Sequence, residues 1–289
     1  MSLILLLPAT ILIVFIFGFP VSRYLWLSFH ASSVITGLDI IPNNGANWFR
    51  LISDDRFWRD AFQTFRFAST SVSIEILLAI GIALLLNQNF KYRGIVRALS
   101  LLPWALPTTI MALGWKWIFN APYGPIEQIG TLIGTDTFNI LSNPSLAWMA
   151  TVLADVWKTT PFIALILLAG LQTIPIDLYE AFKLEGGSNS QAFLKITVPL
   201  LKPYLFLSLL FRLAQAFGVF DLIQIMTGGG PAGSTESLGV YAYLNAMRFL
   251  DFGYSATIIF FSFILLVIIC LFGWIVGGRV QLLINKQVS

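Results

Sequence analysis

Charged and amide side chains occur inside stretches of this chain that are otherwise apolar. Asp155 and Lys158 are three residues apart, and so are Arg212 and Gln215. Residues three apart share one face of a helix, so each pair can act on the same partner. Polar side chains within apolar helices are energetically costly and commonly mark functional sites. They can hydrogen-bond a bound solute, or Asp155 can form a structural ion pair with Lys158 or Arg212.

Two further residues that can contact a solute lie next to Pro103 and Pro107. Trp104 and Thr108 are four residues apart, and each directly follows a proline. Because proline lacks an N–H, nearby backbone carbonyls lose their helical partners and become available. The other charged residues inside apolar stretches are assigned interfacial or structural roles: Arg66, Glu75 and Lys116.

The elements that must position these groups are membrane helices. Of the 289 residues, 57% are hydrophobic and 11% are charged, whereas a soluble domain carries about 25% charged residues. A spanning helix needs about 20 apolar residues. Six segments meet this length: 3–29, 61–88, 98–119, 146–171, 203–226 and 255–278. The first lacks a basic region and a cleavage site, so we interpret it as a retained span. We expect an all-α polytopic membrane protein with six transmembrane helices.

The distribution of basic residues predicts the orientation. They gather in the loop after the second span, in the insert before the fifth and near the C-terminus: Lys91, Arg93, Arg97, Lys183, Lys195, Lys202, Arg279 and Lys286. The positive-inside rule places these segments and both termini in the cytoplasm. Arg50, Arg56 and Arg59 disagree, but long loops cross the membrane with little regard to charge.

The segment 30–60 is then external. Its sequence WFRLISDDRFWRDAF is amphipathic, with Ser53 or Asp54 as the expected N-cap. We expect this stretch to lie along the membrane surface. Four aromatic residues are its expected anchors: Trp48, Phe49, Phe57 and Trp58.

The residues give no support for metal binding, nucleotide binding, nucleic-acid binding or catalysis by this chain. With one histidine and one cysteine the chain offers neither a metal cluster nor an internal disulfide, and His30 reads as a solvated loop residue. The glycine-rich segment 226–237 lacks the Lys-Ser/Thr ending of a phosphate-binding loop. The net charge of +3 is small and scattered, which disfavours nucleic acid. No catalytic constellation is present, so we expect no enzyme site.

The insert between the fourth and fifth spans, EAFKLEGGSNSQAFLKITVPLLKP at 180–203, is unusually polar. A helix with Pro175 in its first turn is expected, then a turn at Gly186 and Gly187. A second helix follows, capped by Ser188 or Ser190, and prolines 199 and 203 redirect the chain into the fifth span. This helix-turn-helix can dock into a partner's groove, or its apolar residues can rest on the bilayer.

The insert resembles the EAA loop of ABC-importer permeases. Five residues match that pattern: Glu180, Ala181, Gly186, Ile196 and Pro199. Phe182, Glu185 and Gly187 depart from it but keep its charge and turn chemistry. The segments LLPWALPTTI, VWKTTPFIALILLAGLQTIP and LIQIMTGGGP are similar to carbohydrate-uptake permeases of the maltose and glycerol-phosphate type, first permease subunit. The resemblance covers residues 60–279.

The resemblance implies a subunit of a heteromeric importer in the bacterial inner membrane. Its partners would be a second permease, two cytoplasmic ATPase subunits that bind ATP and Mg, and an external solute-binding protein. This chain would hold no cofactor. Residues of the insert would contact an ATPase subunit: Tyr179, Glu180, Ala181, Phe182, Glu185, Gly186 and Gly187.

The resemblance also implies a solute site. Sugar contacts of the maltose-type permease, carried over without gaps, fall on nine residues: Trp104, Thr108, Asp155, Lys158, Thr159, Phe162, Arg212, Gln215 and Ala216. Trp104 and Phe162 suit stacking on a pyranose ring. Lys158 and Arg212 replace small neutral residues of that pattern, so an anionic solute such as a glycerol phosphate is an alternative to a disaccharide or a glucosyl polyol.

We expect a first segment at 1–60, a transmembrane core at 61–279 that includes the coupling loop 173–203, and a cytoplasmic tail at 280–289. An ion-coupled secondary transporter, with Asp155 and Glu75 as ion carriers, is the main alternative, and a structural or sensory membrane protein is a weaker one. Neither explains the insert.

Overall fold

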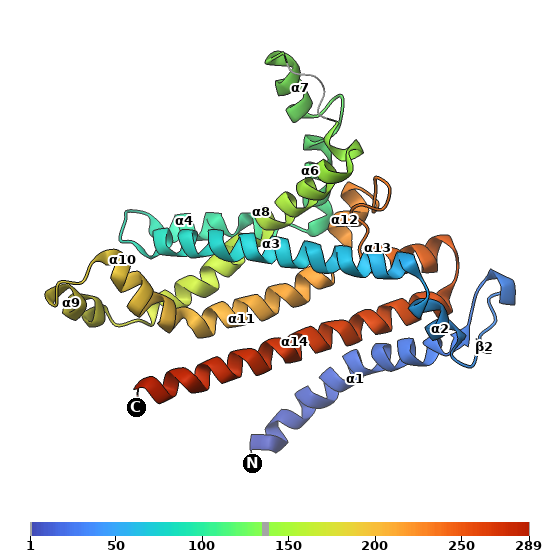
Figure 1. Ribbon diagram of the computed structural model, residues 1–289, viewed down its shortest axis with the longest axis horizontal. Helices are drawn as coiled ribbons and strands as arrows, with labels where there is room; N and C mark the ends of the chain where they lie inside the picture. The colour runs from blue at the N-terminus through green and yellow to red at the C-terminus, as the bar shows by residue number, and fades with distance from the viewer. Residues whose placement is uncertain (1, 135–138, 289) are drawn as a thin grey trace. The chain divides into compact units, whose positions relative to one another are not determined.

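The computed structural model describes residues 2–134 and 139–288, and its long elements are all helices (Figure 1). Five helices in this part of the chain are long and apolar enough to cross a membrane, and a bent helix pair brings the number to six. The long helices are α1 (Ser2–Ser28), α3 (Asp55–Asn87), α8 (Pro144–Gln172), α11 (Val198–Phe217) and α14 (Phe252–Val288). The predicted all-α polytopic fold is confirmed.

The third predicted span, 98–119, is not one straight helix. It consists of α4 (Arg93–Ser100), α5 (Leu102–Ala105) and α6 (Thr108–Ile118), and the direction changes by 85° between Ala105 and Thr108. The residue before a proline is pushed out of the helical region. Leu106, which precedes Pro107, is accordingly extended, with φ −67° and ψ 136°. The break therefore follows from local proline chemistry.

The fifth span begins and ends earlier than predicted. The helix α10 (Asn189–Ala192), a π-helical turn η3 (Phe193–Thr197) and α11 form one span of 29 residues, Asn189–Phe217. Pro199 lies in the first turn of α11 and Pro203 lies inside it. A π turn shifts hydrogen-bond partners by one residue and so accommodates a missing proline N–H. The expectation that these prolines redirect the chain is wrong. Residues 221–226 instead form a separate helix, α12 (Asp221–Met226).

The remaining elements are short. They are β1 (His30–Ala31) paired antiparallel with β2 (Ile41–Pro42), η1 (Val34–Thr36), α2 (Ala46–Ile52), α7 (Pro125–Leu132), η2 (Ile140–Ser142), α9 (Ile176–Leu184), α13 (Leu238–Tyr243) and η4 (Leu244–Arg248).

The predicted amphipathic stretch of the segment 30–60 is divided between α2 and the start of α3. Asp54 Oδ1 accepts hydrogen bonds from the backbone N–H groups of Arg56 and Phe57, at 3.0 and 3.3 Å, and thus caps α3 as expected. Phe57 is not a surface anchor. Its side chain is fully buried, edge-on to Phe261 with ring centroids 5.4 Å apart.

The chain divides into two compact units. The first unit comprises Met1–Gln63 and Glu236–Ile268, and the second comprises Thr64–Thr235 and Ile269–Ser289. The domain boundaries expected from the sequence, at residues 60 and 279, stay a prediction. Residue 289 of the predicted tail and the side chains of Arg279 and Lys286 lie outside the described part of the structure.

The core of the second unit depends on small side chains between helices. Ala79 and Ala83 of α3 pack with Ile163 and Leu167 of α8, all fully buried. At Gly170 an added Cβ would lie 2.6 Å from the ring of Tyr204 on α11. Small residues let membrane helices approach closely, and packing rather than the hydrophobic effect then stabilises the contact.

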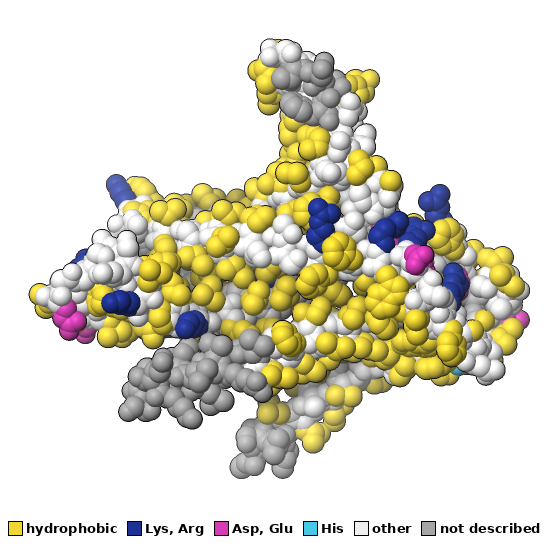
Figure 2. All heavy atoms as spheres, viewed as in Figure 1, with side chains coloured by type: hydrophobic (Ala, Val, Ile, Leu, Met, Phe, Trp, Pro, Cys, Tyr) yellow, Lys and Arg dark blue, Asp and Glu magenta, His cyan; other side chains and the backbone are white. Residues whose placement is uncertain are grey.

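Large hydrophobic side chains remain exposed along the long helices. Figure 2 shows hydrophobic side chains over most of the visible face, with charged side chains at only a few places. Phe15 of α1 and Leu77 of α3 are 70% and 71% exposed. An apolar surface of this extent is suited to lipid rather than water.

Candidate functional site

A cavity of about 370 Å³ lies among α5, α6, α8, α11 and α12 of the second unit. Seven of the nine predicted solute-site residues line it: Trp104, Thr108, Asp155, Lys158, Thr159, Arg212 and Gln215. Asp221 of α12 lines it as well. Residues from five helices thus line one cavity.

The other two predicted residues lie behind this lining. Phe162 stacks on Trp104, with ring centroids 4.6 Å apart and ring planes inclined by 12°. Phe162 therefore supports the aromatic wall instead of forming it. Ala216 is buried and packs with Ala68 and Val72 of α3.

Arg212 and Asp155 of the cavity lining belong to a buried ion cluster. Nε and Nη2 of Arg212 donate to the two carboxylate oxygens of Glu75 at 2.6 and 2.8 Å, and Nη2 also donates to Asp155 Oδ2 at 2.9 Å. Glu75 is 0%, Arg212 2% and Asp155 8% exposed. A charge this deeply buried is tolerated only when it is paired and fully hydrogen-bonded. The structure thus shows the Asp155–Arg212 pair that the sequence left open.

Neutral side chains complete the cluster. The hydroxyl of Thr159 donates to Glu75 at 2.7 Å, and the hydroxyl of Ser71 donates to Asp155 at 2.9 Å. Nη1 of Arg212 donates to Gln215 Oε1 at 3.0 Å. The guanidinium is therefore held from α3, α8 and its own helix α11.

Lys158 does not pair with Asp155 as one interpretation of the sequence proposed. Its ammonium donates to the carbonyl oxygen of Leu106 at 3.0 Å and to the hydroxyl of Thr108 at 2.7 Å. Both acceptors lie at the break between α5 and α6, where the extended backbone leaves the Leu106 carbonyl outside a helix. The carbonyl freed by a proline is thus used by a lysine from α8.

The sequence suggested an interfacial or structural role for Glu75, or an ion-carrier role in the secondary-transporter alternative. In the structure Glu75 is the central acceptor of the buried cluster. The available signal was its position, since it is an acid within the apolar run SVSIEILLAIGIALLL. Its partner Arg212 is 137 residues away, so no local spacing links the two.

The insert forms a tight helical turn in which the two glycines have different roles. Gly186 has φ +82°, a left-handed conformation that glycine adopts without strain. Gly187 is needed for space, because an added Cβ would lie 2.1 Å from the ring of Phe182. Its N–H donates to the Phe182 carbonyl at 2.9 Å.

Local contacts hold the two helices of the insert together. Ser188 caps α10, as one of the two expected alternatives, in a capping box with Gln191. The hydroxyls of Tyr179 and Thr197 are 2.9 Å apart and join α9 to the start of the fifth span. Glu180, Ala181 and Glu185 are exposed, and Leu184 is 90% exposed. The insert thus combines local hydrogen bonds between its two helices with an exposed surface on α9.

An open groove of about 1220 Å³ lies beside the insert. Glu180 and Lys183 of α9 line it together with Arg93 and Arg97 of α4. The basic loop and the insert, which the charge pattern placed on one side of the membrane, therefore border the same space.

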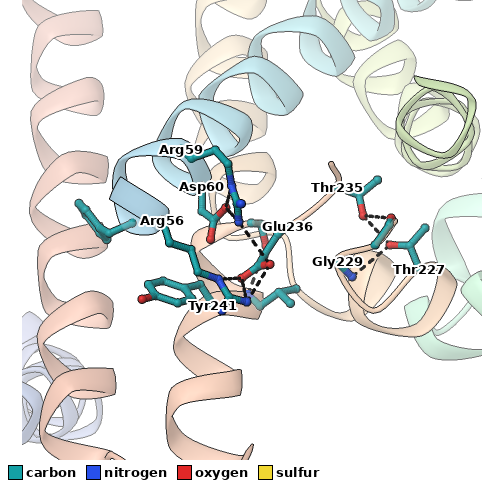
Figure 3. Close-up of polar contacts among 12 residues, drawn as sticks. Arg56, Arg59, Asp60, Thr227, Gly229, Thr235, Glu236 and Tyr241 are labelled. Atoms are coloured by element: carbon teal, nitrogen blue, oxygen red, sulfur yellow. Dashed lines mark hydrogen bonds and ion pairs between the residues drawn. The ribbon is translucent and has the colours of Figure 1, made fainter. Parts of the chain in front are cut away.

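The first unit carries its own charged cluster (Figure 3). Arg56 donates to both carboxylate oxygens of Glu236, at 2.8 and 3.1 Å from Nη2, and Arg59 donates to Asp60 at 2.9 Å. In the second unit the glycine-rich loop is closed by a 2.7 Å hydrogen bond between Thr227 and Thr235 (Figure 3). These contacts explain Arg56 and Arg59 of the segment 30–60 as ion-pair partners.

Asp54 is the acceptor for two tyrosines of the first unit. The hydroxyl of Tyr241 donates to Asp54 Oδ2 at 2.5 Å, and the hydroxyl of Tyr254 donates to the same oxygen. Burial acts to raise the pKa of Asp54, but these hydrogen bonds and those from the backbone outweigh it and lower the pKa below its ordinary value. Burial, together with the Asp54 bond, raises the pKa of Tyr241 to about 12.

The described residues contain no group of three His, Cys, Asp or Glu side chains suited to a metal ion. The buried carboxylates of Glu75 and Asp155 are bound by the Arg212 guanidinium, and Glu75 also accepts a hydrogen bond from a threonine hydroxyl.

A polytopic helical bundle with a polar cavity and a helical insert defines a membrane transport subunit. Residues 75–281 match the family described as the binding-protein-dependent transport system inner membrane component, and this chain belongs to that family. The resemblance to ABC-importer permeases is confirmed. The chain is a permease subunit, ATP hydrolysis belongs to a separate subunit, and the ion-coupled alternative is left without support.

Curated relatives extend over most of the chain. The trehalose/maltose transport system permease protein MalF of Thermococcus litoralis is 43% identical over 257 residues, covering 89% of this chain and 86% of the relative. The sulfoquinovosyl glycerol transport system permease protein SmoG of Agrobacterium fabrum is 36% identical over 258 residues, covering 89% and 84%.

Solved structures show the same fold. A crystal structure of a bacterial alginate ABC transporter, in complex with an alginate pentasaccharide-bound periplasmic protein, has a TM-score of 0.80 at 21% identity. The match covers 96% of this chain and 94% of that one.

Proposed function

We propose that this permease imports a neutral sugar or glycosylated small solute through the cavity described above. The observation that carries the proposal is the cavity lining itself. The Trp104 ring, supported by Phe162, offers a flat face of the kind that packs on a pyranose. Amide, guanidinium and hydroxyl groups on the other walls supply hydrogen bonds, as a polyhydroxylated solute requires.

The charge distribution favours a neutral solute over the anionic alternative. Arg212 is paired with two carboxylates, from Glu75 and Asp155. Asp221 adds a further carboxylate to the lining, and Lys158 is the other cation. Two cations are thus outnumbered by three carboxylates at or directly behind the cavity wall. The trehalose/maltose permease at 43% identity supports the same solute class.

Transport requires partners. The family description and the alginate transporter, which was solved with a periplasmic protein, support an external solute-binding protein as one partner. From the resemblance to ABC-importer permeases we assign a second permease and two ATPase subunits as the others. We assign ATPase contact to the predicted insert residues, Tyr179 to Phe182 and Glu185 to Gly187. Their support is the exposure of Glu180 and Glu185 on a turn stiffened by its two glycines. Movement of this rigid turn would be passed directly to the fifth span, because α10 continues into it.

The orientation follows from the same assignment. If the insert contacts a cytoplasmic ATPase, the basic loop beside it, the N-terminus and the C-terminus lie in the cytoplasm. The charge pattern supports this orientation, and so does the groove shared by α4 and α9.

The test is uptake by the complete importer in proteoliposomes, with labelled trehalose, maltose or sulfoquinovosyl glycerol in the presence of the matching binding protein. We expect ATP-dependent uptake of a neutral sugar. The Glu180→Lys variant should assemble but lose binding-protein-stimulated ATP hydrolysis. Uptake confined to the sulfonated glycoside would overturn the solute assignment, and stimulation equal to wild type in Glu180→Lys would overturn the coupling assignment.

A further inference from the structure

We propose that Glu75 is a positioning residue for the solute cavity: it orients Arg212 and offsets its charge. Arg212 then serves as a hydrogen-bond donor to a neutral solute, not as an anchor for an anionic one. This inference rests on the proposed function and adds a specificity-determining residue to it. Glu75 is itself absent from the cavity lining, whereas Arg212 and Asp155 belong to it.

The geometry of the Glu75–Arg212 contact fixes the plane of the guanidinium. The two oxygens of Glu75 accept from Nε and Nη2, at 2.6 and 2.8 Å. Such a two-point contact between planar groups defines an orientation as well as a distance. The carboxylate in turn accepts from the Thr159 hydroxyl, so its own rotation is restrained.

The orientation leaves a specific part of Arg212 for the solute. A guanidinium has five N–H groups. Glu75 takes two, Asp155 takes one and Gln215 takes one. The fifth, on Nη1, has no protein acceptor among the described residues. Because Arg212 and Gln215 both line the cavity, this N–H and the Gln215 amide are donors for adjacent hydroxyls of a sugar.

The charge of Glu75 determines which solutes this donor favours. The cavity lining contains Arg212, Lys158, Asp155 and Asp221, which is two charges of each sign. Glu75, directly behind Arg212, adds one negative charge. Removing that charge leaves the guanidinium with one carboxylate partner, and an anionic solute then meets a weaker electrostatic barrier. A residue with no contact to the solute thus selects against anions.

The experiment measures binding to the assembled permease–ATPase complex in detergent, without the binding protein, so that the cavity itself is probed. The probes are trehalose, which is neutral, and sulfoquinovosyl glycerol, which carries a sulfonate. In the Glu75→Gln variant we expect the ratio of affinities to shift toward the sulfonate by about tenfold, the size expected for one altered charged hydrogen bond. The Glu75→Asp variant should retain the wild-type preference.

A matched control is Glu127→Gln in α7. Glu127 is also buried, with 1% exposure, and its Oε1 accepts from the Asn139 N–H at 2.7 Å, away from the cavity. We expect this variant to leave the affinity ratio at the wild-type value. A purely structural role of Glu75 would change the yield of assembled complex and not the ratio.

A double variant keeps the test decisive if Glu75→Gln does not assemble. Glu75→Gln with Arg212→Gln removes one charge of each sign, and Asp155 keeps the hydrogen bond from the Ser71 hydroxyl. We expect about tenfold weaker trehalose binding and no gain for the sulfonate. Trehalose binding equal to wild type in this double variant, or an unchanged ratio in an assembled Glu75→Gln complex, would overturn the inference. A wild-type complex that binds neither trehalose nor maltose would instead overturn the proposed function, while the sulfonate comparison still tests Glu75.

Discussion

Nζ of Lys158 on α8 lies 2.7 Å from the hydroxyl oxygen of Thr108, the first residue of α6. A charged side chain of α8 thereby binds the break between α5 and α6. The same ammonium binds the Leu106 carbonyl, which the break leaves outside a helix. Lys158 thus lines the cavity and also restrains the break between α5 and α6. We call its two hydrogen bonds to Leu106 and Thr108 the clamp.

The Lys158→Met variant should lower solute uptake by about tenfold, because the clamp and a hydrogen-bond donor of the cavity are lost together. Uptake by proteoliposomes at matched protein content measures the effect. Lys116→Met is the control, since Lys116 is an exposed lysine on α6. Equal losses in both variants would show that the effect is not specific to the clamp.

The Trp104→Leu variant should raise the KM for trehalose uptake by about threefold to tenfold, which corresponds to the loss of one aromatic stacking contact. The maximal rate should change less, because the buried ion cluster is untouched. Trp117→Leu is the matched control, as Trp117 lies on α6 outside the cavity lining with 59% exposure. An unchanged KM in Trp104→Leu would contradict a stacking role.

The Gly187→Ala variant should uncouple ATP hydrolysis from the binding protein. Its Cβ would lie 2.1 Å from the Phe182 ring, so the turn must shift, at a cost of about 1–3 kcal/mol. Gly94→Ala is the control, because an added Cβ there meets no atom within 4 Å. If Gly187→Ala shows wild-type stimulation, the turn geometry is not needed for coupling.

Acidification should destabilise the first unit through Asp54. Its pKa is lowered below the ordinary value of 3.8 by hydrogen bonds that outweigh the opposing effect of burial. A depressed pKa contributes stability that is present above the unfolded-state pKa and lost as the pH falls through the folded-state value. Thermal unfolding of wild type and Asp54→Asn should therefore differ most near neutral pH and converge as the pH falls below about 4. A constant difference across that range would contradict the assignment.

The hydrogen bond between Tyr241 and Asp54 can also be tested at high pH, where the Tyr241 hydroxyl loses its proton. Its pKa is raised to about 12 by burial and by the bond to Asp54. The associated stability is fully present below the ordinary tyrosine pKa of about 10 and is lost as the pH rises toward 12. Wild type should lose stability over this window more steeply than Tyr241→Phe, as measured by intrinsic fluorescence on alkaline titration.

Local chemistry made several features predictable. The turn at Gly186 and Gly187, the Ser188 cap and the Asp54 cap each depend on residues within a few positions of one another. The broken third span was within reach too, because Pro107 forces the preceding residue out of the helix. The sequence predicted one span over 98–119 without its bend, since apolar length alone does not report direction.

Other features depend on residues that only folding brings together. Glu75 lies on α3 and Arg212 on α11, separated by 137 positions. Asp155, whose neighbour at three positions suggested a pair with Lys158, turned out to bind Arg212 instead. A charge three residues along a helix is one available partner, and a charge on a neighbouring helix competes with it.

The amino-acid sequence by itself determined that this protein lies in a membrane and which class of protein it belongs to. Apolar segments of spanning length and scarce charge leave no other environment, and the insert carries enough local turn chemistry to be recognised. Tertiary structure alone decided how the buried charges are divided among partners, and our proposal of a neutral solute depends on that division. The reason is that pairing energy inside a membrane protein depends steeply on distance and burial, and both are set by how α3, α8 and α11 pack.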